Sequence, residues 1–367
     1  MQASPSELKS KDTPIFIKRL FMPATQTAYG FERGKRKIQR WDNCPIPTPG
    51  ANEVLLKIEA AGICHSDIHI LMSQSPPMDR MVMGHEVCGT IAEVGSALTD
   101  DPRYEVGQRC ALLIGMACGV CVDCRNGKDN QCSRARGGFG IFSDGGFQSY
   151  LVVKEVRCLL PIPDNVTFAQ AASASDAILT PFHAIKKVRH VLNPTAKVLV
   201  FGAGGLGLNA LQILRTYGCH IVSIDKNASN KELALQSGAS EFYTSADDVD
   251  EDSESFDVCF DFVGYQATAN GCVEYVKANG HIVVVGMGNS KLMLPNYNLA
   301  RRDVTVYYNF GGTSSEQMEI MEWISRGVLK PVVQEAPMDE LPMWMDKLER
   351  GEVVGRVVMV PSHKEKL

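Results

Sequence analysis

Residues 197–225 read KVLVFGAGGLGLNALQILRTYGCHIVSID and carry the strongest fold signal of the chain. The first five residues form the short apolar run of a buried strand, and a glycine-rich turn follows at 202–207. The pattern predicts an apolar helix over 206–217 and a second buried strand over 220–224. A strand, a tight turn, a helix and a parallel strand form a βαβ unit, which implies a parallel sheet covered by helices.

The turn has the spacing G-x-G-x-x-G. In this spacing Gly202 makes the tight turn, Gly204 lets phosphate groups approach the backbone, and Gly207 lets the helix pack on the sheet. Free backbone N–H groups at the helix N-terminus then accept a pyrophosphate. A lone match is weak evidence in a chain with 32 glycines, but the flanking strand and helix supply the required context. We therefore predict a Rossmann domain that binds a dinucleotide through Gly202, Gly204, Gly205, Leu206 and Gly207.

Asp225 ends the second predicted strand, close to the expected distance of about 20 residues from the first glycine. A carboxylate at this place accepts hydrogen bonds from the ribose hydroxyls and repels a 2′-phosphate, so NAD(H) is expected rather than NADP(H). Lys226 and Lys231 are cations that soften this exclusion, and Lys226 is counted with the cofactor-binding candidates. The alternative is that Asp225 is an ordinary aspartate of a surface turn.

The rest of the chain divides into regions with different residue patterns. Residues 36–160 show short alternating strands broken by Gly and Pro, which predicts a β-rich domain. The alanine-rich segment 168–185 predicts a helix interrupted at Pro181. Further apolar strands are expected at 258–262 and 281–285, within the parallel sheet.

Four of the twelve cysteines follow the pattern C-x2-C-x2-C-x7-C, at Cys118, Cys121, Cys124 and Cys132. Four thiolates on one short loop can close a tetrahedral shell around a structural zinc ion. An iron–sulfur cluster is the competing metal, although ferredoxin-type runs have a shorter last gap followed by proline. Free or disulfide-bonded cysteines without a metal are the remaining alternative.

A second group of metal-binding residue types occurs in GICHSDIH at 62–69 and GHE at 84–86. The two segments combine a thiol, imidazoles and carboxylates, which are zinc ligands or their neighbours. Taken alone, Cys64 is equally well a buried core thiol, and His85 a core histidine with its hydrogen bonds satisfied.

The segments GICHSDIH, GHE, the four-cysteine loop and FGAGGLG, in this order, resemble the medium-chain zinc alcohol dehydrogenase family over residues 40 to 360. The resemblance implies that Cys64 and His85 bind a catalytic zinc, with Glu86 beside the metal. The third ligand of the family is usually a cysteine in an alanine-rich segment. Here Asp176 holds that place, as in members that act on secondary or aryl alcohols, and an oxygen ligand suits zinc.

The resemblance also implies the roles of the supporting residues. Ser66 takes the proton of the alcohol and passes it by way of the nicotinamide ribose to His69, while Asp67 orients a zinc ligand. The remaining candidates contact the cofactor: His65 and Arg356 at the pyrophosphate, and Thr180 near the nicotinamide. The implied reaction is hydride transfer between an alcohol and NAD, in which the three-ligand zinc keeps one position open.

The implied architecture is an α/β protein with a GroES-like catalytic domain over 1–178, a Rossmann NAD-binding domain over 179–315 and a C-terminal segment over 316–367 that returns to the catalytic domain. The implied cofactors are NAD(H) and two zinc ions per chain, one catalytic and one structural, in a homo-oligomer, either a dimer or a tetramer. Two alternatives remain open: a zinc-independent NAD(P)H double-bond reductase, and a relative that binds a ligand without redox turnover.

Composition limits the partners. Charged residues make up 22% of the chain, and the formal net charge of −5 offers no basic surface for nucleic acid. No apolar run approaches the roughly 20 residues of a membrane helix, and the first twenty residues lack the apolar core of a secretory signal. We therefore expect a cytoplasmic enzyme whose partner is a small alcohol, aldehyde or ketone.

Overall fold

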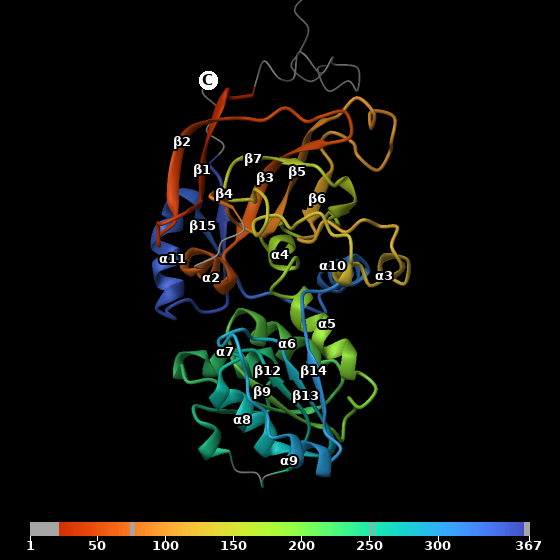
Figure 1. The fold of residues 1–367 in the computed structure, drawn as a ribbon, viewed down its shortest axis with the longest axis vertical. Coiled ribbons are helices and arrows are strands. Elements are labelled where there is room, and N and C mark those ends of the chain that lie inside the picture. The colour runs from red at the N-terminus through yellow and green to blue at the C-terminus, as the bar shows by residue number, and fades with distance from the viewer. Residues whose placement is uncertain (1–21, 74–77, 250–251, 253, 363–367) are drawn as a thin grey trace, which may run out of the picture.

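The chain folds into two parts, one above the other in Figure 1. This computed structural model describes residues 22–73, 78–249, 252 and 254–362. A mostly antiparallel β-rich part carries both the N-terminal strands and the last strand, and a parallel sheet with helices forms the other part. Within the described residues no helix is long and apolar enough to cross a membrane.

A six-stranded parallel sheet confirms the predicted Rossmann architecture. Its spatial order is β11 (Glu241–Tyr243), β10 (His220–Ile224), β9 (Lys197–Phe201), β12 (Phe256–Asp261), β13 (Val276–Val284) and β14 (Thr305–Tyr308). Numbered along the chain, this is the order 3-2-1-4-5-6 of dinucleotide-binding folds, with the first strand beside the fourth. The cofactor crevice of such a sheet lies where the strand order reverses, after β9 and β12.

One helix precedes these strands and the others connect them, and the glycine-rich turn leads directly into one of the connecting helices. The helices are α5 (Leu179–Val188), α6 (Gly205–Arg215), α7 (Lys231–Ser237), α8 (Gln266–Tyr275) and α9 (Asn296–Arg301), with the short 3-10 turns η3 (Ala228–Asn230) and η4 (Ala246–Asp248). The predicted helix after the glycine turn is thus present as α6, which begins one residue earlier and ends two residues sooner than expected.

The β-rich part contains a seven-stranded sheet. Its order is β15 (Val333–Pro337), β16 (Arg356–Val360), β3 (Val54–Gly62), β5 (Glu86–Val94), β6 (Arg109–Leu112) and β8 (Leu159–Pro161), with β7 (Tyr150–Val153) paired to β3. A three-stranded sheet packs beside it, made of β2 (Gln39–Pro45), β1 (Thr25–Glu32) and β4 (Arg80–Val82). Because β16 pairs antiparallel with β3, the end of the chain completes a sheet begun some 300 residues earlier.

Short helices complete this part and the junction between the parts: α2 (His65–Met72), α3 (Val122–Arg125), η1 (Asp129–Gln131), η2 (Val156–Cys158), α4 (Phe168–Ser173), α10 (Ser314–Ser325), η5 (Met338–Glu340) and α11 (Leu341–Glu349).

The prediction of a helix break at Pro181 was wrong. The alanine-rich segment does break, but over residues 174–178, between α4 and α5. Pro181 is the third residue of α5, in the first turn, where a backbone N–H has no partner within the helix and proline costs little. The interruption therefore falls on Asp176 rather than after it.

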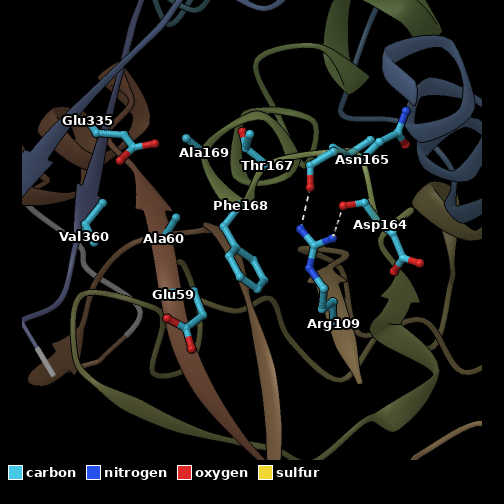
Figure 2. A pocket seen from close by; sticks show the side chains of 11 residues that line it. Glu59, Ala60, Arg109, Asp164, Asn165, Thr167, Phe168, Ala169, Glu335 and Val360 are labelled. Atoms are coloured by element: carbon cyan, nitrogen blue, oxygen red, sulfur yellow. Dashed lines mark hydrogen bonds between the residues drawn. The ribbon is translucent and has the colours of Figure 1, made fainter. Parts of the chain in front are cut away.

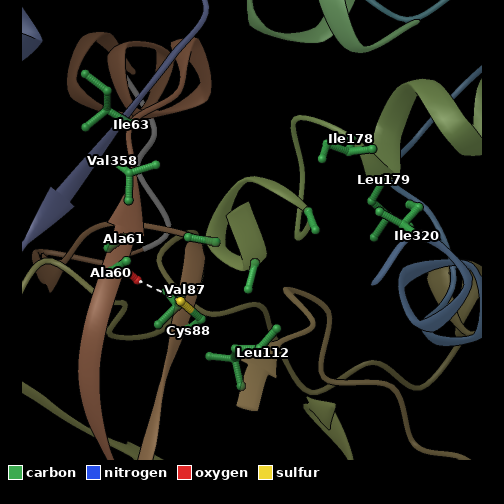
Figure 3. Packing of buried hydrophobic residues seen from close by; sticks show 14 of the residues in the cluster. Ala60, Ala61, Ile63, Val87, Cys88, Leu112, Ile178, Leu179, Ile320 and Val358 are labelled. Carbon is green, nitrogen blue, oxygen red and sulfur yellow. Dashed lines mark hydrogen bonds between the residues drawn. The ribbon is translucent and has the colours of Figure 1, made fainter. Parts of the chain in front are cut away.

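The core beneath the site is apolar and closely packed. Figure 3 shows Ala60 and Ala61 of β3, Val87 and Cys88 of β5 and Val358 of β16 stacked under α2, all with at most 1% of their surface exposed. Because these small side chains let the strands pack closely, the strands are rigid, and the loops that begin where the strands end are held in fixed positions. The candidate metal residues lie at these strand ends.

Candidate metal and cofactor sites

Three elements bring the predicted catalytic-zinc ligands together. Cys64 follows β3 and caps the N-terminus of α2, His85 precedes β5, and Asp176 lies in the break between α4 and α5. Because β3 and β5 pair with Gly62 opposite Glu86, the first two ligands are neighbours across the sheet. Gly84 makes the turn before His85 at φ +93°, where a Cβ would lie 2.6 Å from the Phe147 ring.

The distances between the ligand atoms fit a zinc ion. Asp176 Oδ2 lies 3.3 Å from Cys64 Sγ and 3.5 Å from His85 Nε2. Bonds of about 2.0–2.3 Å in a tetrahedral shell separate neighbouring ligand atoms by about 3.3–3.8 Å. His85 Nε2 is buried and has no hydrogen-bond partner among the described residues, as expected of an atom that awaits a metal. Burial opposes ionisation of Asp176, but His85 and Arg356 outweigh it and lower the pKa of this carboxyl, which keeps it an anion.

Asp67 lies behind the first two ligands. It is completely buried in α2, its Oδ2 accepts a hydrogen bond from the Cys64 N–H at 2.9 Å, and its Oδ1 lies 3.2 Å from His85 Nδ1. A carboxylate on the far nitrogen of a histidine favours the tautomer whose other nitrogen is free to bind a metal.

Glu86 and Arg356 form a buried ion pair beside the three ligands. Arg356 Nη2 lies 2.9 Å from Glu86 Oε1 and 3.9 Å from Asp176 Oδ2, and Arg356 Nη1 donates to the Ile63 carbonyl at 2.8 Å. Burial raises the pKa of Glu86 to about 8, although the positive charge of Arg356 opposes this rise. The Glu86 carboxyl also accepts a hydrogen bond from the Ala177 N–H, which ties it to the segment that carries Asp176.

The two residues of the predicted proton path lie on α2. Ser66 Oγ is 3.8 Å from Cys64 Sγ, so its hydroxyl lies beside the candidate metal ligands. His69 is exposed about one turn further along the helix. In the described part of the chain the two side chains do not hydrogen-bond to each other, and their predicted roles stay predictions.

The four cysteines of the C-x2-C-x2-C-x7-C motif also converge, with none of them in a disulfide. Cys121 Sγ and Cys132 Sγ are 3.8 Å apart, which fits two ligands of one zinc ion. The sulfurs accept backbone N–H groups, for example Cys132 Sγ from Cys118 N at 3.2 Å. Such hydrogen bonds, first that of the Cys124 N–H, lower the pKa of the Cys121 thiol to about 6 and favour the metal-binding thiolate.

The glycine turn has the shape that a dinucleotide requires. Gly202 has φ +93°, and a Cβ on Gly207 would lie 1.8 Å from the Gly202 carbonyl oxygen, so helix and turn touch there. A Cβ on Gly204 would meet no atom within 4 Å. The packing of the protein therefore does not require glycine at 204, whereas a pyrophosphate lying against the backbone does. Gly205 and Leu206 begin α6, and Gly205 lies beside the Arg356 guanidinium.

The other cofactor candidates lie around this turn. Asp225 accepts the Ala203 N–H at 2.7 Å and the Asn227 N–H at 2.8 Å, which fixes its carboxylate at the end of β10, while Lys226 is exposed. Partial burial and then the nearby charge of Arg356 lower the pKa of His65.

Thr180, which is predicted to lie near the nicotinamide, donates its hydroxyl to Asp176 Oδ1 at 2.6 Å. No sequence motif predicts this contact, although a threonine four residues after an aspartate at the start of a helix is a signal for it.

A separate recess lies away from these residues. Figure 2 shows it between β3, β16 and the start of α4, with a volume of about 440 Å³ and with Glu59, Glu335, Phe168 and Arg109 in its wall. Arg109 donates to the carbonyl groups of Pro163 and Asp164 and lies over the Phe168 ring at 4.6 Å, so its charge serves to hold this loop. The described residues that line the recess include none of the candidate site residues.

Comparison with known proteins identifies the family. Residues 50–164 match the family model described as the alcohol dehydrogenase GroES-like domain, and residues 205–326 match the zinc-binding dehydrogenase family. A curated alcohol dehydrogenase of Geobacillus stearothermophilus is 29% identical over 321 residues, which cover 84% of this chain and 91% of that protein.

Comparison with solved structures leads to the same family. An acetophenone reductase from Geotrichum candidum, solved in complex with NAD, is 37% identical with a TM-score of 0.86, over 92% of this chain and 98% of the other. The alcohol dehydrogenase of Aeropyrum pernix is 26% identical with a TM-score of 0.84, over 91% of this chain and all of the other. The chain therefore belongs to the zinc-dependent medium-chain dehydrogenase/reductase family, as an oxidoreductase of the alcohol dehydrogenase type.

Proposed function

We propose that this enzyme interconverts secondary or aryl alcohols and their carbonyl compounds with NAD(H), using a zinc ion held by Cys64, His85 and Asp176. The convergence of the three ligand atoms, at the separations that zinc requires, carries this proposal. The NAD complex and the aryl ketone in the name of the acetophenone reductase support the cofactor and the substrate class.

Each residue beside the metal has a separate task in this proposal. Zinc, when bound, supplies positive charge that favours the deprotonated alcohol, and NAD accepts the hydride. Ser66 takes the proton of the substrate hydroxyl, and His69, exposed on the same helix, releases a proton to solvent. Asp67 orients His85, and Glu86 with Arg356 balances the charge behind the ligands.

The second zinc ion of the proposal is structural and is held by Cys118, Cys121, Cys124 and Cys132. Four sulfur ligands close the shell, so no position is left for substrate.

A bound dinucleotide would be held by the glycine turn, with His65 and Arg356 as partners for its pyrophosphate and Asp225 as the partner for its ribose hydroxyls. Replacing Asp225 with asparagine is expected to lower kcat/KM for NAD relative to NADP by about 10–100-fold, because hydrogen bonds to a charged group are worth about 1.5–3 kcal/mol. Steady-state kinetics with both cofactors measure the ratio. Glu232→Gln, which removes an exposed charge on nearby α7, is the matched control and should leave the ratio unchanged. An Asp225→Asn variant with the wild-type ratio would contradict the assignment.

We further propose a homo-oligomer. The last strand of the parallel sheet, β14, pairs with no second strand on its outer edge among the described residues, and exposed large side chains occur in β14 and in the segments that precede and follow it in sequence. They are Tyr297, Tyr308, Phe310 and Met293, each with more than half of its surface exposed. An open edge strand beside exposed aromatic residues is a typical surface for a second copy of the chain.

Zinc content tests the metal proposal. Elemental analysis of the wild type should give two zinc ions per chain, and Asp176→Ala should give one and lose alcohol oxidation, because two remaining protein ligands hold zinc poorly. One zinc ion in the wild type would leave the zinc-independent double-bond reductase or the ligand-binding protein as the better explanation. Two zinc ions in Asp176→Ala would show that Asp176 is not a ligand.

A further inference from the structure

The Asp176 carboxylate is held by a hydroxyl group on its side away from the metal cluster. Asp176 Oδ2 faces Cys64 Sγ and His85 Nε2, at 3.3 and 3.5 Å. Asp176 Oδ1 accepts a hydrogen bond of 2.6 Å from Thr180 Oγ1. The two oxygens therefore have different partners, one in the cluster and one on α5.

The residues next to Asp176 along the chain are held by hydrogen bonds that do not involve its carboxylate. Three hydrogen bonds, all of 3.1 Å, anchor the residues on either side: Glu86 Oε1 with the Ala177 N–H, Asn209 Nδ2 with the Ala177 carbonyl, and Gln317 Nε2 with Ser175 Oγ. None of them reaches the Asp176 carboxylate. Among the described residues Thr180 donates the hydrogen bond to Asp176 Oδ1, and Arg356 Nη2 lies 3.9 Å from Oδ2, so on the side away from the cluster the Thr180 hydroxyl restrains rotation of the carboxylate.

Thr180 is itself a rigid donor. It lies in the first turn of α5 with 8% of its surface exposed, its N–H donates to the Asp176 carbonyl at 2.9 Å, and its own carbonyl accepts from Asn309 Nδ2 at 3.0 Å. As a β-branched residue in a helix it has few χ1 rotamers. These contacts hold the hydroxyl in the direction of the carboxylate.

We propose that Thr180 is a positioning residue that keeps Asp176 a one-oxygen zinc ligand. This inference rests on the proposed role of Asp176. A carboxylate can bind a metal through one oxygen or through both. A second oxygen on zinc would compete for the position that substrate must take, since catalytic zinc keeps one position open. A cysteine at this place has a single sulfur and cannot occupy a second position on zinc. The residue that restrains the second oxygen is therefore needed only because this chain has an aspartate here.

The test compares Thr180→Val, which removes the hydroxyl but keeps the shape, with Thr180→Ser, which keeps the hydroxyl. The readout is the rate at which a metal-chromogenic chelator removes zinc from the holoenzyme, with the zinc of the four-cysteine site in the same sample as internal reference. The Thr180 hydroxyl also holds Asp176 Oδ2 toward the metal, because it restrains the other oxygen of the same carboxylate. Loss of such an outer hydrogen-bond partner typically costs 10–100-fold in metal affinity, so Thr180→Val should release one zinc about 10–100-fold faster. Thr180→Ser should release it at nearly the wild-type rate. Wild-type release from Thr180→Val would overturn the proposal.

The same substitution in an Asp176→Cys background separates action through Asp176 from any other effect. Thr180→Val should have no effect on zinc release there, because the oxygen that it restrains is gone. The absorption spectrum of cobalt-substituted protein adds a second readout: Thr180→Val should shift its d–d bands from the four-coordinate toward the five-coordinate pattern. An equal acceleration in the cysteine background, or an unchanged cobalt spectrum, would contradict the proposal. Failure of the Asp176 assignment is recognised separately, by two zinc ions in Asp176→Ala.

Discussion

Cys121→Ser is expected to cost the enzyme one zinc ion and the ordered structure of its four-cysteine lobe, residues 118–132. The lobe contains only the four-residue helix α3 and the single turn η1, and it has few apolar side chains to bury. A zinc ion bound by the four cysteines would therefore supply most of its folding free energy, on the order of 10–16 kcal/mol in small zinc peptides. Whole domains are stable by only about 5–15 kcal/mol, so this loss exceeds what local contacts can replace.

The effect should reach beyond the lobe, because η1 holds the junction between the two parts of the molecule. Both carboxylate oxygens of Asp129 lie 3.2 Å from the Ser314 N–H at the start of α10. Asn130 Nδ2 donates to the Phe310 carbonyl at 3.1 Å and lies 3.2 Å from His183 Nε2 on α5. A disordered lobe releases these contacts, and α10 then loses a partner at its N-terminus.

Thermal unfolding and limited proteolysis measure this prediction. Cys121→Ser should contain one zinc ion per chain, unfold at a clearly lower temperature and be cleaved within the lobe. Cys44→Ser is the control, since Cys44 is a partly buried thiol outside both metal clusters. A Cys121→Ser protein that keeps two zinc ions and the wild-type unfolding temperature would show that the lobe does not depend on a metal.

Above pH 8, where the Glu86 carboxyl is ionised, Arg356→Met is expected to lower the free energy of unfolding by about 3–5 kcal/mol, the usual cost of breaking a buried ion pair from one side. Arg356 is 5% exposed, its Nη2 lies 2.9 Å from the completely buried Glu86, and its Nη1 holds the Ile63 carbonyl next to Cys64. Methionine fills similar space but leaves the Glu86 carboxylate without a cation. Because Arg356 also lies beside Gly205 at the cofactor turn, KM for NAD should rise as well.

Denaturant unfolding of the single and double variants checks this result. Adding Glu86→Gln to Arg356→Met should recover part of the lost stability, since the unpaired charge is then absent. Arg350→Met is the matched control, because Arg350 and Glu352 form an exposed pair worth at most about 1 kcal/mol. Equal losses in Arg350→Met and Arg356→Met would refute the burial argument.

The sequence determined the features whose signals are local. A glycine-rich turn between an apolar strand and an apolar helix specifies its own backbone, so residues 197–225 predicted β9, α6 and β10 nearly to the residue. The spacing of the four cysteines likewise predicted a cluster, because a short loop can bring its own side chains together. The family resemblance added Cys64, His85 and Asp176, which the structure brings within reach of one metal ion.

Only the tertiary structure decided what surrounds these residues. Arg356 contacts the Ile63 carbonyl across 293 positions of sequence, and Gln317 contacts Ser175 across 142. The place of the helix break on Asp176 rather than at Pro181 depends on which backbone groups find partners in the packed fold. Composition and periodicity describe one segment at a time, whereas a buried ion pair or a hydroxyl aimed at a carboxylate exists only after distant segments have packed together. For that reason the sequence indicated the chemistry of the site, and the fold alone determined how its ligands are held.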